Sequence, residues 1–297
     1  MTTTNVTLLD GAMGTELRAR GVRVRDYKTS LWSALACIEH PEAVVELHRE
    51  YIEAGADIIT ANNYAITPRL LARENKESQL PELLSLVGKC ARRSLDGAGR
   101  TARIAGSLPP LGTSYATEEV GPFETNVEQY RRIIEHLNPF VDLYIAETMS
   151  TADEARAAAH AASESNKPFM ISWTLHPKGL ELRSNESLQH AMRALEPYTP
   201  KALLVNCSSC NAITIAIRTL RVLTDLPIGA YANPVLNEPE GGEPERTPIN
   251  PLSPEEYSTH ARTWITDGAT IIGGCCDTNP SHIASLHRLR RNDHGSQ

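Results

Sequence analysis

LYIAETMSTADEARAAAHAASESNKPFMISW, residues 143–173, reads as a strand, a helix and a second strand. The apolar runs at 143–146 and 169–173 have the length of buried strands. The alanine-rich segment at 151–164 between them carries Asp and Glu near its start, as helices often do. This order favours two parallel strands connected by a helix that packs on the sheet.

The same alternation extends along the chain in both directions. Short apolar runs predict strands at 6–9, 57–60, 103–105, 143–146, 169–173, 202–205, 227–230 and 270–272. Helical patterns predict helices at 41–54, 81–95, 125–137, 151–164, 186–195, 211–223, 254–266 and 280–289. Eight strand–helix units in a row indicate an α/β fold in which a single (β/α)8 TIM barrel is closed by its parallel strands.

The composition shows no boundary that would mark a second domain. We therefore expect residues 1–297 to form one domain, with a loop rich in Pro, Glu and Gly at 237–250 after the seventh strand. Hydrophobic residues make up 41% of the chain, which is enough for a sizeable core.

Charge and hydropathy narrow the possible functions. The formal net charge of −7 disfavours nucleic-acid or anionic-membrane surfaces, because both require clustered Lys and Arg. No apolar run approaches the roughly 20 residues that span a bilayer. The first residues, MTTTNVT, lack the basic start and apolar segment of a secretory signal. We therefore expect a cytoplasmic protein.

Functional residues of such a barrel lie at the C-terminal ends of its strands. The residues found there are Asp10-Gly11, Asn62-Asn63-Tyr64, Gly106-Ser107, Glu147-Thr148, Trp173-Thr174, Asn206-Cys207, Tyr231-Ala232-Asn233 and Gly273-Gly274-Cys275-Cys276. Polar and reactive side chains are therefore predicted to gather on one face of the barrel.

Three cysteines predict a metal site on that face. Cys207, Cys275 and Cys276 follow the sixth and eighth strands, and alternate strands of a barrel contribute to the same side-chain layer. Three thiolates suit tetrahedral Zn²⁺ with a fourth position left open. Gly273 and Gly274 are expected to allow a tight turn that brings both adjacent thiols to one ion. The alternative is a set of buried thiols without a metal.

The other cysteines have simpler interpretations, since six cysteines in a chain of this length do not form a disulfide framework. Cys207 and Cys210 form a Cys-x-x-Cys pair that could act as a redox dithiol. Thioredoxin-like folds are much smaller than an eight-stranded barrel, so we expect Cys210 to be a helix-cap or core residue. Cys37 and Cys90 fall in helix-like stretches and are expected in the core.

Two carboxylates are candidates for substrate binding. Alone, Asp10 suits a turn before Gly11, and Glu147 suits a helix cap or an arginine partner. Together they could hold the ammonium group of an amino-acid substrate, with backbone N–H groups of Gly11 and Gly14 facing its carboxylate. No dinucleotide-binding or Walker motif is present. The histidines on predicted helices, His282 among them, are expected to be exposed, and none pairs with a Ser or Cys nucleophile.

Several motifs resemble the homocysteine S-methyltransferase family, and the resemblance covers nearly the whole chain. The motifs are DGAMGTEL at 10–17, AGADIIT at 54–60 followed by Asn62-Asn63-Tyr64, Glu147-Thr148, VNCS at 205–208 and GGCC at 273–276. The paired GGCC with an upstream Asn-Cys is highly specific to that family.

The resemblance implies a (β/α)8 barrel that binds zinc through the catalytic residues Cys207, Cys275 and Cys276. It implies that Glu147 and Asp10 hold the homocysteine amino group. It further places Trp32 near the methyl donor and gives Asn206 and Tyr231 a role in shaping the pocket.

The chain also departs from its apparent relatives. They often carry Thr at the positions of Ala61 and Asn63, so substrate contacts at Asn63 are expected to differ. After the third strand they often have Gly-Pro-Tyr, where this chain reads SLPPLGTSY at 107–115, a loop that could line the donor site.

The expected reaction is methyl transfer to homocysteine, which yields methionine. Zinc would stabilise the homocysteine thiolate near neutral pH, and the thiolate would attack the methyl group in line. Aromatic faces such as Trp32 and Tyr115 would hold a cationic donor. We expect that no cobalamin or folate module and no long C-terminal arm follows residue 297. We therefore expect S-methylmethionine as the donor, followed by S-adenosylmethionine.

Other functions stay open. The runner-up donors are betaine and dimethylsulfoniopropionate, and a different class is a non-catalytic zinc- or thiol-binding barrel. Asp10 and Glu147 disfavour the latter, because a storage site needs no amino-acid clamp. A zinc hydrolase is disfavoured because three thiolates make zinc a poor Lewis acid towards water. The expected partners are homocysteine and its donor, without nucleic acid or membrane, for a monomer or small homo-oligomer.

Overall fold

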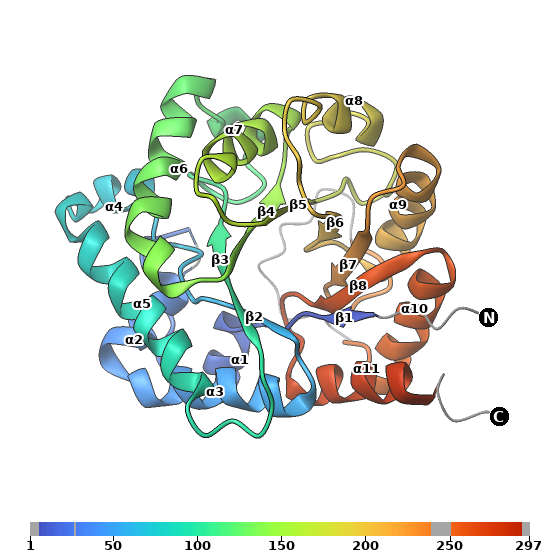
Figure 1. The fold of residues 1–297 in the computed structure, drawn as a ribbon, viewed down its shortest axis with the longest axis horizontal. Helices are drawn as coiled ribbons and strands as arrows, with labels where there is room; N and C mark the ends of the chain where they lie inside the picture. The colour runs from blue at the N-terminus through green and yellow to red at the C-terminus, as the bar shows by residue number, and fades with distance from the viewer. Residues whose placement is uncertain (1–5, 27, 239–250, 293–297) are drawn as a thin grey trace.

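Eight parallel strands lie at the centre of the computed structural model, which describes residues 6–26, 28–238 and 251–292 (Figure 1). The strands are β1 (Thr7–Leu8), β2 (Ile58–Thr60), β3 (Arg103–Leu108), β4 (Leu143–Met149), β5 (Phe169–Trp173), β6 (Leu203–Asn206), β7 (Ile228–Ala232) and β8 (Ala269–Gly274). They pair in the order β1-β8-β7-β6-β5-β4-β3-β2, and a parallel bridge between Leu9 and Ile58 links the two ends of this order. The predicted (β/α)8 barrel is confirmed.

Helices surround the strands in Figure 1. They are α1 (Gly14–Ala19), α2 (Leu35–Glu39), α3 (Pro41–Ala54), α4 (Pro68–Arg73), α5 (Leu80–Leu95), α6 (Phe123–Leu137), α7 (Ala152–Ser163), α8 (Leu188–Arg193), α9 (Cys210–Leu223), α10 (Pro254–Thr266) and α11 (Pro280–Asn292). The eight predicted helices correspond to α3 and α5 to α11. The helix-like stretch around Cys37 corresponds to α2. The short helices α1 and α4 were not predicted, because six residues alone carry too little hydrophobic periodicity.

Side-chain parity along the strands determines which residues enter the barrel interior. On β4, Leu143 and Ile145 pack in the interior cluster, whereas Tyr144 and Ala146 pack in the outer core beneath the helices. Successive side chains of a strand point to opposite faces, so Glu147 continues the interior series. β4 runs on to Met149, and Glu147 therefore lies within the strand rather than after the predicted end at residue 146.

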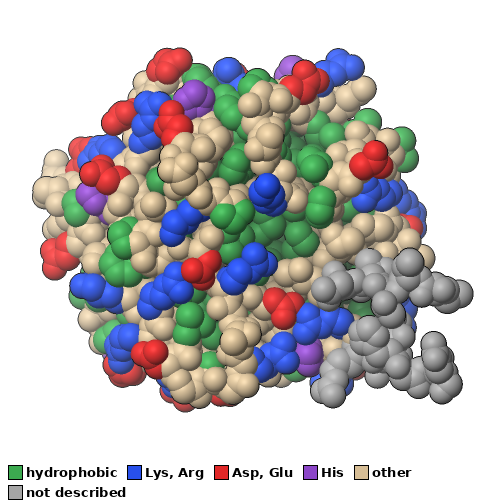
Figure 2. Space-filling view, in the orientation of Figure 1, with side chains coloured by type: hydrophobic (Ala, Val, Ile, Leu, Met, Phe, Trp, Pro, Cys, Tyr) green, Lys and Arg blue, Asp and Glu red, His purple; other side chains and the backbone are tan. Residues whose placement is uncertain are grey.

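The surface of the barrel mixes charges of both signs. Figure 2 shows hydrophobic side chains at the centre of the viewed face, with Lys, Arg, Asp and Glu side chains interspersed around them. In the described part of the chain, no helix is long and apolar enough to cross a membrane. The predicted loop at 237–250 lies outside the described residues from position 239 onwards.

His48 on α3 should make the protein sensitive to acid. Its side chain is fully buried, and neither ring nitrogen has a hydrogen-bond partner among the described residues. Burial lowers the His48 pKa from 6.5 to about 4. The unfolded chain therefore binds a proton at His48 more readily than the folded chain does. The contribution of neutral His48 to the free energy of unfolding is complete above pH 6.5 and is lost as the pH falls through 4. Acidification from pH 7.5 to pH 5 should therefore lower the free energy of unfolding by about 2 kcal/mol through His48.

Urea unfolding at both pH values measures this effect in the unaltered protein, His48→Leu and His190→Leu. His48→Leu should lose about 2 kcal/mol less on acidification than the unaltered protein. His190 is exposed on α8, and His190→Leu should behave like the unaltered protein. An equal loss in all three proteins would show that His48 is not the acid-sensitive group.

Candidate functional site

A cavity of about 190 Å³ lies where the strands end. Its wall includes residues that follow β1, β2, β6 and β8, together with Glu147 from within β4. Of the predicted site residues, Asp10, Gly11, Trp32, Glu147, Tyr231, Cys207, Cys275 and Cys276 all line this cavity. The C-terminal ends of the strands therefore bring thiols, carboxylates and aromatic rings to one place, as expected for this fold.

The thiols of Cys207, Cys275 and Cys276 form one cluster. Their sulfur atoms all lie within 4.8 Å of one another, and the Sγ atoms of Cys207 and Cys276 are 3.7 Å apart. Two sulfurs on a tetrahedral zinc, with Zn–S bonds of about 2.3 Å, are separated by about 3.8 Å. All three cysteines are free thiols, and their soft donor atoms fit a zinc ion. No other described group of three or more His, Cys, Asp or Glu residues has this arrangement.

The cluster also favours a thiolate at Cys207. Hydrogen bonds from the thiols of Cys275 and Cys276 lower the pKa of the Cys207 thiol well below its usual range. The Cys207 backbone has φ of +50°, a left-handed conformation that a non-glycine residue seldom adopts. Its N–H donates to the Tyr231 carbonyl at 3.2 Å, which anchors the strained residue to β7. Residues with such a strained backbone cluster at active sites and ligand-binding sites.

The two glycines before the cysteine pair are needed for packing. Gly273 and Gly274 are strand residues of β8, and neither has positive φ. The expected tight turn is therefore wrong. A Cβ on Gly274 would overlap the Thr278 side chain, and one on Gly273 would lie 2.6 Å from Leu9 Cβ. Close approach of neighbouring segments, rather than turn geometry, requires glycine at both positions.

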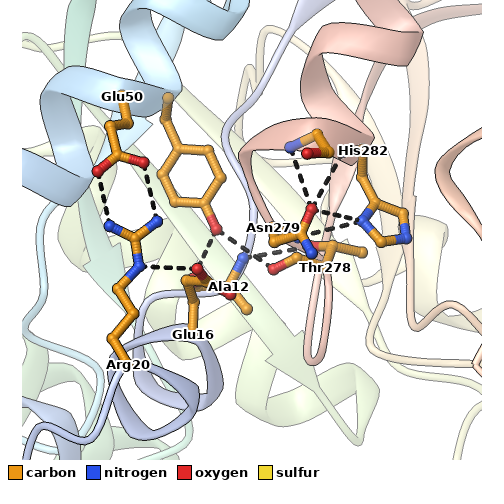
Figure 3. Close-up of polar contacts among 9 residues, drawn as sticks. Ala12, Glu16, Arg20, Glu50, Thr278, Asn279 and His282 are labelled. Atoms are coloured by element: carbon orange, nitrogen blue, oxygen red, sulfur yellow. Dashed lines mark hydrogen bonds and ion pairs between the residues drawn. The ribbon is translucent and has the colours of Figure 1, made fainter.

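Hydrogen bonds join the loops that follow β1 and β8. Thr278 Oγ1 accepts from the Ala12 N–H at 3.2 Å and donates to the Cys275 carbonyl at 2.7 Å. The Tyr51 hydroxyl contacts the carbonyls of Ala12 and Thr278, at 2.7 and 3.2 Å. Figure 3 shows Ala12 and Thr278 of this network together with His282, which is buried rather than exposed as predicted. The loop that carries Cys275 and Cys276 is thus fixed relative to Asp10 and Gly11.

Asn206 supports the thiol cluster from behind the cavity wall. Its side-chain amide accepts from the Thr148 N–H and donates to Thr148 Oγ1, both at 2.9 Å. The same amide lies 3.9 Å from Cys275 Sγ. Thr148 has φ of +60°, which is costly for a β-branched residue, and the two Asn206 bonds stabilise it there. Asn206 therefore orders the ends of β4 and β6 rather than facing the cavity.

The carboxyls of Asp10 and Glu147 are buried in the cavity wall. Burial raises the pKa of Asp10 to about 8 and that of Glu147 to about 7. Asp10 accepts from the Thr60 N–H at 2.8 Å, and Glu147 accepts from the Ser107 hydroxyl at 2.5 Å. Neither carboxyl has an arginine or lysine partner in the described part of the chain. A bound ammonium group would supply the missing positive charge.

Aromatic rings form another part of the wall. Trp32 and Tyr64 pack edge to face, with ring centroids 5.9 Å apart. Gly14 permits this placement, because a Cβ there would overlap the Trp32 ring. The Tyr231 hydroxyl and the Trp32 indole N–H are buried without a hydrogen-bond partner within range among the described residues. These polar atoms are available to a ligand.

Asn63 does not line the cavity. Its amide exchanges hydrogen bonds with the Ser107 backbone, accepting at 3.1 Å and donating at 2.8 Å. The neighbouring Asn62 is the residue that lines the wall. Asn63 thus holds the end of β3 and acts on Glu147 only through Ser107.

Sequence reasoning missed several further residues of the wall. They are Arg18, Thr60 and Asp277, whereas Asn62 and Tyr64 were noted at a strand end without a role. Ser107, noted in the same way, does not line the wall, but its hydroxyl donates to Glu147. Strand parity could have assigned Ser107, because Ala105 two residues earlier packs inside the barrel. Arg18 lies on the short helix α1 and Asp277 in the loop after β8, and no hydrophobic periodicity predicts either position.

The site can now be compared with known proteins. The family model for homocysteine S-methyltransferase matches residues 7–289. Homocysteine S-methyltransferase from Escherichia coli strain K12 is 31% identical, over 95% of this chain and 94% of its own length. Homocysteine S-methyltransferase YbgG from Bacillus subtilis strain 168 is 30% identical, over 94% of this chain and 92% of its own. The metallated crystal structure of the E. coli homocysteine methyltransferase MmuM superposes with a TM-score of 0.80, 29% identity and 96% coverage of both chains.

Proposed function

The chain belongs to the homocysteine S-methyltransferase family of enzymes, and from this membership we propose that it methylates homocysteine at a zinc site, using a sulfonium donor. The observation that carries the proposal is the single cavity in which the three thiols face two buried carboxylates. Thiols alone would suit metal storage, whereas the carboxyls add a site for an amino group.

Homocysteine carries a thiol and an ammonium group, which match the thiol cluster and the two carboxyls of this cavity. A zinc ion held by Cys207, Cys275 and Cys276 would supply a Lewis acid that stabilises a thiolate near neutral pH. The carboxyls of Glu147 and Asp10 would then hold the substrate ammonium and so orient its sulfur. The sulfur electron pair forms the new S–CH₃ bond as the donor S–CH₃ bond breaks, which leaves a neutral thioether and methionine.

Aromatic and charged groups favour S-methylmethionine as the donor. Trp32 and Tyr64 offer ring faces to a sulfonium cation, whereas the Arg183 guanidinium already lies over the Tyr115 ring, 4.8 Å from its centroid. Arg18 and Asp277 also line the cavity. They could bind the carboxylate and the primary ammonium of a second amino acid. Betaine and dimethylsulfoniopropionate carry a carboxylate but no primary ammonium group.

The proposed reaction requires reduced thiols. All six cysteines are free in the structure, and a reducing compartment keeps thiols in that state. We therefore place the reaction in the cytoplasm, carried out by residues 1–297 as one domain. The chain would act as a monomer or small homo-oligomer on its two small-molecule substrates.

A methionine-formation assay tests this function directly. Zinc-loaded, reduced protein is given homocysteine with S-methylmethionine, S-adenosylmethionine, betaine or dimethylsulfoniopropionate in separate reactions. We expect turnover with S-methylmethionine, slower turnover with S-adenosylmethionine, and none with betaine. Preference for betaine or dimethylsulfoniopropionate would overturn the donor assignment. Absence of methionine with every donor, despite one bound zinc per chain, would favour a non-catalytic zinc- or thiol-binding protein.

A further inference from the structure

Tyr115 contacts the thiol cluster from a loop distant in sequence. It follows β3, has φ of +67°, and places its hydroxyl 2.8 Å from Cys207 Sγ. A tyrosine hydroxyl keeps its proton at neutral pH, since its pKa is normally near 10. A thiolate has no proton to donate, so at a metal-bound Cys207 the hydrogen bond must run from Tyr115 to sulfur.

A buried ion pair lies behind the Tyr115 ring. The Arg183 guanidinium stands over that ring, and its Nη2 donates to Glu238 Oε2 at 2.5 Å. Only 11% of the Arg183 side chain and 9% of the Glu238 side chain are exposed. Burying two charges has a large desolvation cost, and replacing a buried ion pair by apolar residues is often neutral or stabilising for the fold. The ion pair is therefore poorly explained by stability alone.

The arrangement places positive charge close to the thiol cluster. The Arg183 guanidinium lies over the Tyr115 ring, and the hydroxyl of the same ring contacts Cys207 Sγ. Three thiolates around a divalent zinc carry a net charge of −1, and a fourth thiolate from the substrate would raise it to −2. A hydrogen bond and a nearby cation would offset part of this charge, since buried charges interact strongly.

We propose that Tyr115 and Arg183, with Glu238 fixing the guanidinium, form a positioning unit that withdraws charge from the Cys207 sulfur. The unit would strengthen zinc binding and offset part of the negative charge that a substrate thiolate adds to the site. It deepens, and rests on, the proposed zinc-dependent function. Three separate loops, which follow β3, β5 and β7, supply its members.

Two variants test the unit, and a third serves as a matched control. Tyr115→Phe removes the hydroxyl that meets the sulfur, and Arg183→Gln removes the charge behind it. Tyr64→Phe removes another buried hydroxyl of the cavity, which bonds the Ser114 hydroxyl at 2.9 Å instead of a thiol. Circular dichroism of each apoprotein verifies folding, and competition with a chromogenic chelator gives the zinc affinity.

We expect Tyr115→Phe to weaken zinc binding about 10-fold, as outer-shell partners of metal ligands typically do. Arg183→Gln should weaken it too, and the double variant should lose little more than Tyr115→Phe, because the two residues act together. Tyr64→Phe should bind zinc like the unaltered protein. Losses that simply add in the double variant would contradict a single unit.

The cobalt spectrum gives a second measurement that does not depend on turnover. In Co²⁺-loaded protein the sulfur-to-metal charge-transfer band should move to lower energy in Tyr115→Phe, because a thiolate without its hydrogen bond holds its electrons less tightly. Unchanged zinc affinity and an unchanged band would overturn the proposal. Both readouts stay valid without methyl transfer, so an inactive protein that still shows the Tyr115 effect would refute only the proposed function.

Discussion

Cys275→Ser should eliminate methyl transfer and most of the bound zinc. Serine has nearly the same size as cysteine, but its hydroxyl stays protonated at neutral pH and is a poor ligand for a soft metal site. Cys275 is one of three sulfur atoms within 4.8 Å of one another, so the cluster has no spare ligand among the described residues. We expect activity to fall by more than about 100-fold, the upper limit for losing an outer-shell partner.

Cys210→Ser provides the matched control for this experiment. Cys210 is also buried, but it lies at the start of α9, and its thiol donates to the Asn233 carbonyl at 3.5 Å. A serine there keeps a donor, so zinc content and turnover should be retained. Metal analysis and the methionine assay decide the outcome. One zinc per chain with full activity in Cys275→Ser would refute the ligand set, and equal losses in both variants would revive the redox interpretation of Cys207 and Cys210.

The fold was predictable because it depends on local hydrophobic patterns repeated eight times. Each buried strand is a short apolar run, and each long covering helix has its own periodicity. The ends of the strands were less predictable. Ser107 and Glu147 look like loop residues, yet both lie within strands, because the interior of the barrel near its C-terminal end accepts polar side chains.

The same reasoning explains which site residues the sequence could identify. Cys207, Cys275 and Cys276 follow strands of equal parity, so their convergence follows from the barrel itself. The choice between Asn62 and Asn63 depends on a difference of one residue, which moves a side chain from the cavity wall to the Ser107 backbone. The contact between Tyr115 and Cys207 joins positions 92 residues apart through an irregular loop, and no periodicity predicts it.

Glu147→Gln should weaken homocysteine binding about 100-fold while leaving zinc in place, since truncating one partner of a buried charge pair costs about 2–5 kcal/mol. Glutamine keeps the shape of the side chain and can still accept from the Ser107 hydroxyl, so the change removes mainly the charge. The Asp10 carboxyl, whose pKa is raised to about 8, can still accept a hydrogen bond from the ammonium group, which makes the loss partial. Calorimetric titration of zinc-loaded protein with homocysteine measures the affinity, and metal analysis measures the zinc.

The pH dependence of binding separates a charge effect from a shape effect. Burial raises the Glu147 pKa to about 7, so this carboxyl is mostly protonated at pH 6 and mostly ionised at pH 8. Only the ionised form attracts an ammonium group, and the Glu147 contribution to affinity should therefore rise with pH across this range. The homocysteine thiol and Asp10, whose pKa is raised to about 8, add their own pH dependence in both the unaltered protein and Glu147→Gln. The ratio of the homocysteine affinity of the unaltered protein to that of Glu147→Gln should then grow from pH 6 to pH 8.

Glu154→Gln is the control that makes this test specific. Glu154 on α7 is buried, and burial likewise raises its pKa to about 7, but its carboxyl accepts from the Ser150 N–H outside the cavity wall. This variant should bind homocysteine like the unaltered protein at both pH values. If Glu147→Gln behaved in the same way with its zinc intact, the amino group of the acceptor would be held elsewhere. The two carboxyls of the cavity would then be part of its structure, and homocysteine would lose its principal support as the acceptor.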